Sequence, residues 1–322
     1  MIFIDKYVTI NSVKNMEQFY EIEKNDSFNL VHIFECGQCF RWNKEENGSY
    51  TGVFKNNVLN VKEENGKIKF QGICEGNIEE IVKDYFDFDT DYTKIKATLS
   101  KVDKYLEESI KFGSGIRIVN QDLWEVLISF IISANNNIPR IKGIVERISK
   151  QYGKEIKYQE KVYYTFPTPE ELSKASVEDL RKLGLGFRDK RVYETTQKIK
   201  NGEIDLKQIE NMGDTNKIRE TLENLPGVGP KVADCILLFG LKRFEVFPID
   251  VWVRRIMNDL YIKNEDETKV NKKEIEKLAK TKYAGLAGIA QQYLFYWRRA
   301  IWAYNLYLVE QEQENPTTAT KK

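Results

Sequence analysis

LPGVGPKVADC, at residues 225–235, is the stretch that determines how the second half of this chain folds. Apolar residues recur with the period of an α-helix before it, and the same period returns after it. These residues are Ile218, Leu222 and Leu225 on the first side, and Val232, Cys235, Ile236 and Phe239 on the second. The sequence therefore predicts two helices joined by one tight hairpin.

The hairpin, Gly227-Val228-Gly229, is suited to holding an anion. Glycine has no Cβ, so the two glycines permit positive φ and let the backbone approach a ligand closely. Amide groups at the N-terminus of the following helix point outward as hydrogen-bond donors. We expect this hairpin to bind a phosphate oxygen.

Lys231 lies at the same helix end and is a candidate nucleophile. The partial positive charge of a helix N-terminus, together with desolvation, disfavours an ammonium group and favours the neutral, nucleophilic amine. Asp250 follows Pro248 and precedes a helical run, so we predict an N-cap whose ionised carboxylate accepts backbone N–H bonds. An amine beside a fixed carboxylate is suited to breaking a glycosidic bond through a Schiff base with the sugar carbon.

A passive role is the alternative for the hairpin. Helix-hairpin-helix elements also bind phosphate without doing chemistry, and a lysine at a helix start is commonly solvated. For the hairpin alone this passive role is favoured. Lys231 together with Pro248-Ile249-Asp250 at this spacing shifts the balance toward an enzyme.

The composition is that of a globular protein with a substantial core. The 322 residues are 41% hydrophobic, which is compatible with two or three subdomains. The 50 basic and 49 acidic residues nearly cancel, so any nucleic-acid footprint must be a local patch. The longest apolar run, 123–134, is shorter than the ~18 residues of a membrane helix. No secretion signal is recognisable, so neither secretion nor membrane insertion is expected.

The four cysteines, at positions 36, 39, 74 and 235, fit a reducing compartment better than a disulfide scaffold. Cys36 and Cys39 form a lone CxxC pair without the two further ligands that zinc needs. The only histidine, His32, lies in the apolar run LVHIF, which indicates a strand. We expect no metal site and no cofactor.

The chain divides into a β-rich part and a helical part, which predicts an α+β fold. Up to about residue 72 there are short β-prone runs with Asn-Gly turn signals: IFIDKYVTI, NLVHIF, CFRW, YTGVF, NVLNV and KIKFQ. Helical patterns follow over 78–86 and 92–112, and nearly everything beyond is helical. The predicted organisation is an antiparallel β-sheet domain with two closing helices, an all-α domain and a disordered tail, over 1–113, 114–309 and 310–322.

Three further segments carry side chains suited to DNA. In the basic segment 181–191, Phe187 can wedge into a base stack while Arg188 bonds an unpaired base. The asparagines at 135–137 and Arg140 stand at a turn. Gln291 and Phe295 share a helical face and suit an extruded nucleobase. Each has a structural alternative, namely a core phenylalanine, caps and turn formers, and a core aromatic stripe.

Motifs spread over most of the chain carry a resemblance to a known family. They are CGQCFRW at 36–42, ISANNNIPRI at 132–141, LRKLGLGFR at 180–188, LPGVGPKVADC at 225–235, FPIDVW at 247–252 and AQQYLF at 290–295. Together they resemble the 8-oxoguanine DNA glycosylase/lyases of the helix-hairpin-helix (HhH-GPD) superfamily. The resemblance implies that the enzyme flips 8-oxoguanine out opposite cytosine, excises it through a lysine Schiff base and cleaves the abasic strand by β-elimination. It implies double-stranded DNA containing 8-oxoguanine as partner.

The resemblance also assigns roles at the lesion. Lys231 corresponds to the Schiff-base nucleophile and Asp250 to the carboxylate that assists base loss. The carbonyl of Gly37 would accept the N7 hydrogen that 8-oxoguanine has and guanine lacks. The flipped base would lie between Cys235 and Phe295, and its Watson–Crick edge would face Gln291.

On the opposite strand, the resemblance assigns Asn135, Arg140 and Arg188 to the gap and the orphaned cytosine, with Phe187 as the wedge. Phe187 stands where tyrosine is frequent, and Trp252 stands where many members have histidine that contacts phosphate. AQQYLF is in register only with an insertion around 286–288. These departures bear on affinity and opposite-base preference.

Two kinds of alternative remain open. One is a helix-hairpin-helix glycosylase for alkylated bases or oxidised pyrimidines, although no iron–sulfur cysteines follow Cys235 and alkylated-base enzymes generally lack a lysine at position 231. The other is a non-catalytic helix-hairpin-helix DNA-binding protein. We expect a monomer, in the cytoplasm if the source is prokaryotic or in the nucleus if it is eukaryotic.

Overall fold

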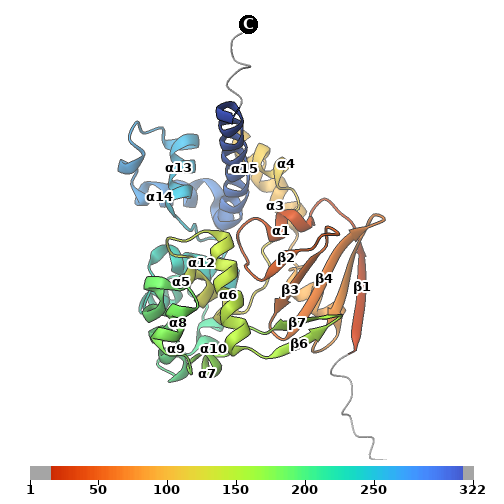
Figure 1. The fold of residues 1–322 in the computed structure, drawn as a ribbon. Coiled ribbons are helices and arrows are strands. Elements are labelled where there is room, and N and C mark those ends of the chain that lie inside the picture. The colour runs from red at the N-terminus through yellow and green to blue at the C-terminus, as the bar shows by residue number, and fades with distance from the viewer. Residues whose placement is uncertain (1–15, 315–322) are drawn as a thin grey trace, which may run out of the picture.

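The computed structural model describes residues 16–314 and confirms the α+β fold (Figure 1). A five-stranded antiparallel sheet lies on one side, and helices form most of the remainder. The strand order is β1-β5-β4-β3-β2. The strands are β1 (Glu17–Glu23), β2 (Trp42–Lys44), β3 (Tyr50–Phe54), β4 (Asn57–Glu64) and β5 (Lys67–Ile73).

The start of the sheet differs from the prediction. The run at 2–10 lies outside the described residues, and the first described strand, β1, was not predicted. Asn65 and Gly66, with φ of 53° and 75°, form the tight turn between β4 and β5, as the Asn-Gly signal indicated. Pairing of β1 with β5 places it at the open edge of the sheet.

The prediction of a strand around His32 was wrong. LVHIF forms the short helix α1 (Leu30–Phe34), because the Asn29 side chain accepts a hydrogen bond from the His32 amide and caps it. Leu30, Ile33 and Phe34 are buried on one face of the helix. His32 Nδ1 accepts a bond from the Gly115 amide at 3.1 Å, and burial lowers its pKa.

The helical pattern over 92–112 forms two helices instead of one. Helix α2 (Ile78–Tyr85) agrees with its pattern, and α3 (Tyr92–Leu99) and α4 (Lys104–Phe112) follow it. The break lies at Asp103, whose carboxylate accepts the amides of Tyr105 and Leu106 and so starts a new helix.

The second half is helical except for one β-hairpin, β6 (Glu155–Tyr158) and β7 (Lys161–Tyr164), which departs from the all-α prediction. Tyr158 of this hairpin packs with Val53 and Val58 of the sheet, which ties the two halves together (Figure 1). The helices are α5 (Leu123–Ser133), α6 (Ile138–Tyr152), α7 (Pro169–Leu172), α8 (Val177–Lys182), α9 (Asp189–Lys200), α10 (Leu206–Glu210), α11 (Thr215–Glu223), α12 (Pro230–Leu241), α13 (Val251–Met257), α14 (Lys272–Tyr283) and α15 (Ala287–Glu314).

The start and the end of helix α15 both bear on what the sequence predicted. Helix α15, which carries Gln291 and Phe295, is separated from α14 by a 3₁₀ turn at Ala284–Leu286, where Ala284 has φ of 47°. Helix α15 continues to Glu314, so the predicted tail at 310–322 begins inside a helix, and 315–322 lie outside the described residues. None of the described helices is long and apolar enough to cross a membrane.

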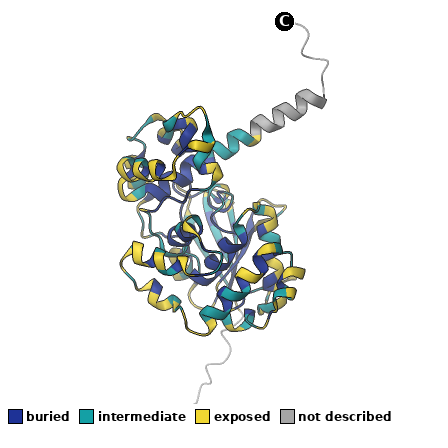
Figure 2. Cartoon of the chain, turned by 90° about the vertical axis from the view of Figure 1, so that its left-hand side faces the viewer, coloured by how far each residue is buried: buried dark blue, intermediate teal, exposed yellow. Residues whose placement is uncertain are grey.

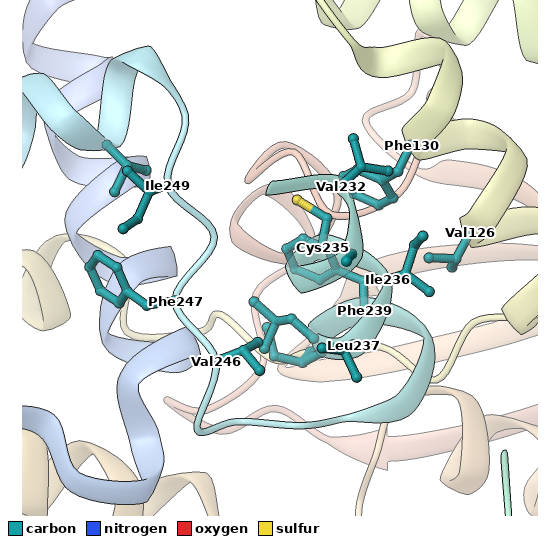
Figure 3. Close-up of a cluster of buried hydrophobic side chains, with 14 of the residues drawn as sticks. Val126, Phe130, Val232, Cys235, Ile236, Leu237, Phe239, Val246, Phe247 and Ile249 are labelled. Atoms are coloured by element: carbon teal, nitrogen blue, oxygen red, sulfur yellow. The ribbon is translucent and has the colours of Figure 1, made fainter. Parts of the chain in front are cut away.

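The core of the helical half centres on α5 and α12. Helix α5 is apolar and buried on nearly every side, so it must be enclosed by other helices. Its Phe130 stacks on Phe239 of α12, with ring centroids 5.3 Å apart. Figure 3 shows this cluster with the segment 246–249 beside α12, and Figure 2 shows buried residues inside both halves.

Truncation of Phe239 tests this core. Phe239→Ala leaves a cavity against Phe130, so we expect the free energy of unfolding to fall by about 3–5 kcal/mol. Phe19→Ala is the control, because Phe19 is 56% exposed on β1, and it should change this free energy by less than about 0.5 kcal/mol. Urea denaturation measures both, and equal effects would contradict the packing described.

Candidate active site

A cavity of about 490 Å³ brings residues from both halves of the chain together. Four residues predicted for the site lie on its wall, namely Gly37, Lys231, Asp250 and Phe295. The wall also contains Phe40, Phe130, Ser133, Asn136, Asn137, Ile138, Pro139, Ile141, Trp252, Arg299, Trp302 and Ala303. Segments far apart in the sequence thus meet at one mostly apolar site with few polar groups, as is usual for ligand pockets.

The predicted hairpin joins α11 and α12. Gly227 has φ of 88°, and a Cβ there would lie 3.0 Å from the Arg191 side chain and 3.1 Å from Ile131, so only glycine fits. Gly229 is the N-cap of α12 and has open space where a Cβ would stand. No side chain caps this helix end, which leaves first-turn amides free to bind an anion.

Lys231 stands in the first turn of α12. Its Nζ lies 5.5 Å from the centroid of the Phe130 ring, so an apolar face flanks the amine. Cys235 lies one turn further along and is buried. Burial raises the pKa of the Cys235 thiol to about 11, the Lys231 charge opposes that rise, and the Asp250 charge adds to it. Lys231 and Asp250 border the same cavity, and Cys235 lies buried one turn from Lys231 on α12.

Asp250 is the N-cap of α13, as predicted. Its Oδ1 accepts a hydrogen bond from the Val253 amide at 2.8 Å. The residues just before it, Val246, Phe247 and Ile249, are buried and fix the segment in place (Figure 3). No donor among the described residues bonds the other carboxylate oxygen, and Asp250 borders the cavity.

Gly37 and Phe295 lie next to each other on the cavity wall. Gly37 has φ of 87°, and a Cβ there would lie 3.5 Å from Ile138 Cδ1 and 3.8 Å from Phe295 Cε1. The loop is held by the buried Gln38, a residue that the sequence analysis did not single out. Its amide donates to the carbonyls of Ile33 and Arg117 and accepts from the Val119 amide. Only the folded structure brings these partners together, so no sequence signal was present.

Cys235 and Gln291 are buried and do not border the cavity in this form of the protein. The Gln291 side-chain oxygen accepts a hydrogen bond from Gln292 at 3.2 Å. Gln291 and Phe295 lie one turn apart on α15, as their spacing predicted. The structure thus places the flat ring of Phe295 on the wall, with the amide of Gln291 in the layer beneath the surface.

The residues predicted for the opposite strand, Asn135, Arg140, Phe187 and Arg188, do not themselves border the cavity. Phe187 is 54% exposed, so the alternative of a core phenylalanine is wrong. Arg188 is 2% exposed, and its guanidinium donates to the carbonyls of Ala134, Asn135 and Leu185. Arg140 is exposed, and its one side-chain hydrogen bond to a described residue, to the Gly184 carbonyl, is long at 3.5 Å.

Two further residues of the cavity wall, Arg299 and Trp302, were not predicted from the sequence. Arg299 on α15 donates to the Glu35 carbonyl and places its guanidinium 5.6 Å from the centroid of the Phe295 ring. Trp302, one turn further, packs against Trp252 with ring centroids 5.2 Å apart. The spacing of Phe295, Arg299 and Trp302 at i, i+4 and i+7 was the available signal.

Two family models match the chain in succession. Residues 20–127 match the 8-oxoguanine DNA glycosylase N-terminal domain, and residues 128–298 match the HhH-GPD superfamily of base excision DNA repair proteins. The chain belongs to this family. The resemblance drawn from the dispersed motifs is thereby confirmed.

Curated relatives and solved structures within the family agree with this assignment. A probable N-glycosylase/DNA lyase of Methanothermobacter thermautotrophicus is 34% identical over 68% of this chain and 72% of its own length. The N-glycosylase/DNA lyase of Saccharomyces cerevisiae is 32% identical over 80% of this chain and 73% of its own. The Clostridium acetobutylicum 8-oxoguanine glycosylase/lyase has been solved with double-stranded DNA containing cytosine opposite 8-oxoguanine. It is 40% identical to this chain, with a TM-score of 0.82, and the match covers 89% of this chain and 98% of that one.

The burial of the four cysteines predicts how the reactivity of their thiols depends on pH. Burial raises the pKa of Cys36 and Cys235 to about 11 and that of Cys74 to about 12, and it raises the pKa of Cys39 further. Because the thiolate forms only when pH rises toward these values, native thiols should react with a disulfide reagent at pH 8 at least about 100-fold slower than unfolded ones.

Absorbance of the released thiol measures this reaction with and without urea. In urea all four cysteines should react, since the sequence contains four. One fast equivalent in the native protein at pH 8 would contradict the buried placement. Repeating the measurement with Cys235→Ser would show whether that equivalent came from the residue beside Lys231.

Proposed function

We propose that this chain excises 8-oxoguanine opposite cytosine from duplex DNA and cleaves the abasic strand, with Lys231 as the nucleophile. The observation that carries the proposal is the shared cavity wall, where Lys231 and Asp250 adjoin an apolar pocket that also contains Gly37 and Phe295. The names of the relatives, N-glycosylase/DNA lyase and 8-oxoguanine glycosylase/lyase, support the same activity.

The first step breaks the glycosidic bond. The neutral amine of Lys231 attacks C1′ of the extruded nucleotide, a C1′–N bond to lysine forms, and the C1′–N9 bond to the base breaks. Positive charge develops on the sugar as the base departs, and the carboxylate of Asp250 stabilises it. Asp250 is suited to this role because its N-cap bond fixes the group while one oxygen remains for the cavity.

The second step cleaves the strand. The attached amine loses its proton and the sugar ring opens, which gives a Schiff base between Lys231 Nζ and C1′. The Schiff base acidifies C2′, so that a base removes a C2′ proton and the bond from C3′ to its phosphate oxygen breaks. We propose that Asp250, beside the same carbon, accepts and returns protons during this β-elimination.

Recognition of the base is proposed for the other end of the cavity. The positive φ of Gly37 and its closeness to the Phe295 ring suit a carbonyl that accepts the N7 hydrogen of a stacked 8-oxoguanine. We assign the second stacking face to Cys235 and the Watson–Crick edge to Gln291. Both side chains are buried here, so these two roles require side-chain rotation when the base enters.

Contacts outside the cavity are assigned to the remaining residues. The uncapped first-turn amides of α12, which directly follow the hairpin Gly227-Val228-Gly229, suit a phosphate of the damaged strand. Phe187 is exposed beside the guanidinium groups of Arg188 and Arg191, which suits a wedge into the duplex. Arg140 and Asn135 would then face the orphaned cytosine. The substrate places the enzyme with the chromosome, in the cytoplasm of a prokaryote or the nucleus of a eukaryote.

Borohydride trapping tests the nucleophile. Wild-type protein should form a covalent adduct with a duplex that carries one 8-oxoguanine opposite cytosine, and none with undamaged DNA. Lys231→Gln removes the amine, so the adduct should fall to background while binding to the damaged duplex is retained. A retained adduct or strand cleavage by Lys231→Gln would overturn the assignment, and lesion binding without chemistry in the wild type would favour a passive binder.

Replacement of Asp250 separates its two tasks. Asp250→Asn can still accept the Val253 amide but carries no charge, so we expect a single-turnover excision rate lower by about 10²–10⁴-fold with little change in melting temperature. Asp214→Asn, which alters the N-cap of α11 away from the cavity, is the matched control and should leave the rate unchanged. Equal rates for Asp250→Asn and wild type would contradict the role of the charge.

A further inference from the structure

Trp252 and Trp302 form a pair of indoles in the wall of the cavity. Trp252 comes from the first turn of α13, and Trp302 comes from α15. Their ring centroids are 5.2 Å apart at an interplanar angle of 43°, and both residues border the cavity that contains Lys231 and Asp250. The pair is therefore part of the same site, on the side next to Asp250.

Trp252 is the exposed member of this pair, and Trp302 is partly buried. Trp252 is 48% exposed, although a well-packed core lies within the same helix at Val253, Ile256 and Met257. A single exposed aromatic side chain needs no explanation, but an aromatic pair that borders a cavity is a candidate ligand contact. The exposed surface borders a cavity here, so a ligand inside that cavity would cover it.

The two indoles are held in place from outside the cavity. The Arg255 guanidinium lies 5.3 Å from the Trp252 ring centroid, and the Arg298 guanidinium lies 5.5 Å from that of Trp302. Neither arginine borders the cavity. Each is fixed by an acidic partner, Glu267 at 3.0 Å for Arg255 and Asp259 at 2.8 Å for Arg298. Ion pairs and cation–π contacts thus fix the orientation of the indoles before any ligand binds.

The residues near the two indoles indicate which part of a nucleotide the rings contact. The reacting sugar carbon must lie against Lys231 and Asp250, and the base extends from it toward Gly37 and Phe295. Trp252 follows Asp250 by two residues and both border the cavity, so the indole lies near the carboxylate that the reacting sugar must meet. The carbon-bound hydrogens of deoxyribose are apolar and pack well on an aromatic face.

We infer that Trp252 and Trp302 form an aromatic wall against which the deoxyribose of the extruded nucleotide packs, and that they act as positioning residues for C1′. This inference rests on the proposed function, because it requires a nucleotide extruded into the cavity. The wall holds the sugar with its reacting carbon facing Lys231. It contributes affinity only after extrusion, since a nucleotide stacked in a duplex cannot reach the cavity.

The experiment measures binding of the Lys231→Gln protein, which cannot turn over its substrate, to three duplexes of one sequence. One carries 8-oxoguanine opposite cytosine, one carries a tetrahydrofuran abasic analogue at that position, and one is undamaged. Trp252→Ala in this background should weaken binding to the first two duplexes by the same factor, about tenfold, and leave the third unchanged. Trp252→Phe, which keeps an aromatic face, should recover most of the loss.

A matched control comes from the neighbouring residue. Val251 is 52% exposed on the same helical turn but does not border the cavity, so Val251→Ala should bind all three duplexes like its parent. Trp302→Phe and Trp302→Ala repeat the test from α15. Because tryptophan carries no charge, none of these changes should alter the slope of log affinity against log salt.

The outcomes distinguish a contact with the sugar from a contact with the base or with DNA in general, and from failure of the proposed function. A loss confined to the 8-oxoguanine duplex would show a base contact and overturn the sugar wall. A loss on all three duplexes, or an altered salt slope, would show a general DNA contact and overturn it too, as would unchanged binding. If Lys231→Gln itself shows no preference for either modified duplex over the undamaged one, the proposed function fails before the wall is tested.

Discussion

The packing of α12 against α5 is the constraint on which the rest of the site depends. Phe239 and Phe130 stack with ring centroids 5.3 Å apart in the core, and the centroid of the same Phe130 ring lies 5.5 Å from the amine of Lys231 at the start of α12. One helix pair therefore supplies both the stability of the domain and the position of the nucleophile. The hairpin before α12 can be tight because Gly227 adopts a φ of 88° against Arg191 and Ile131. A shift of α12 would move the core, the phosphate-binding amides and the amine together.

Asp250, the second reactive group, is held in place as the N-cap of α13. Asp250 ends a buried segment and begins α13, and its hydrogen bond to the Val253 amide uses one oxygen. An N-cap aspartate is normally a local feature that stabilises a helix by about 1 kcal/mol. Here the same geometry directs the carboxylate into a cavity whose other walls are mostly apolar, where a charge acts strongly on a developing cation. Structural and chemical requirements thus coincide in one side chain, as they do at Lys231.

Features determined by neighbouring residues were predictable from the sequence, and features determined by distant residues were not. The hairpin glycines, the Asp250 cap and the helical face of Gln291 and Phe295 follow from local geometry. The apolar run at 30–34 contained no period that distinguishes a short helix from a strand, and Asn29 decided in favour of the helix. The hairpin β6–β7 gains its stability from the sheet of the other half, which a local pattern does not show. Gln38 positions Gly37 through partners as distant in sequence as Val119.

The arginines assigned to the opposite strand show how burial changes an interpretation based on residue type. Arg188 and Arg140 are equivalent in the sequence as guanidinium groups near a turn, yet three carbonyls occupy the donors of Arg188 and only one long bond holds Arg140. Charge-assisted hydrogen bonds are stronger than neutral ones, so turning Arg188 toward a base would give up its bonds to the carbonyls of Ala134 and Asn135. Arg188 therefore maintains the positive φ of 50° at Asn135 in this form of the protein, and Arg140 is the guanidinium that can reach an unpaired base without such a cost.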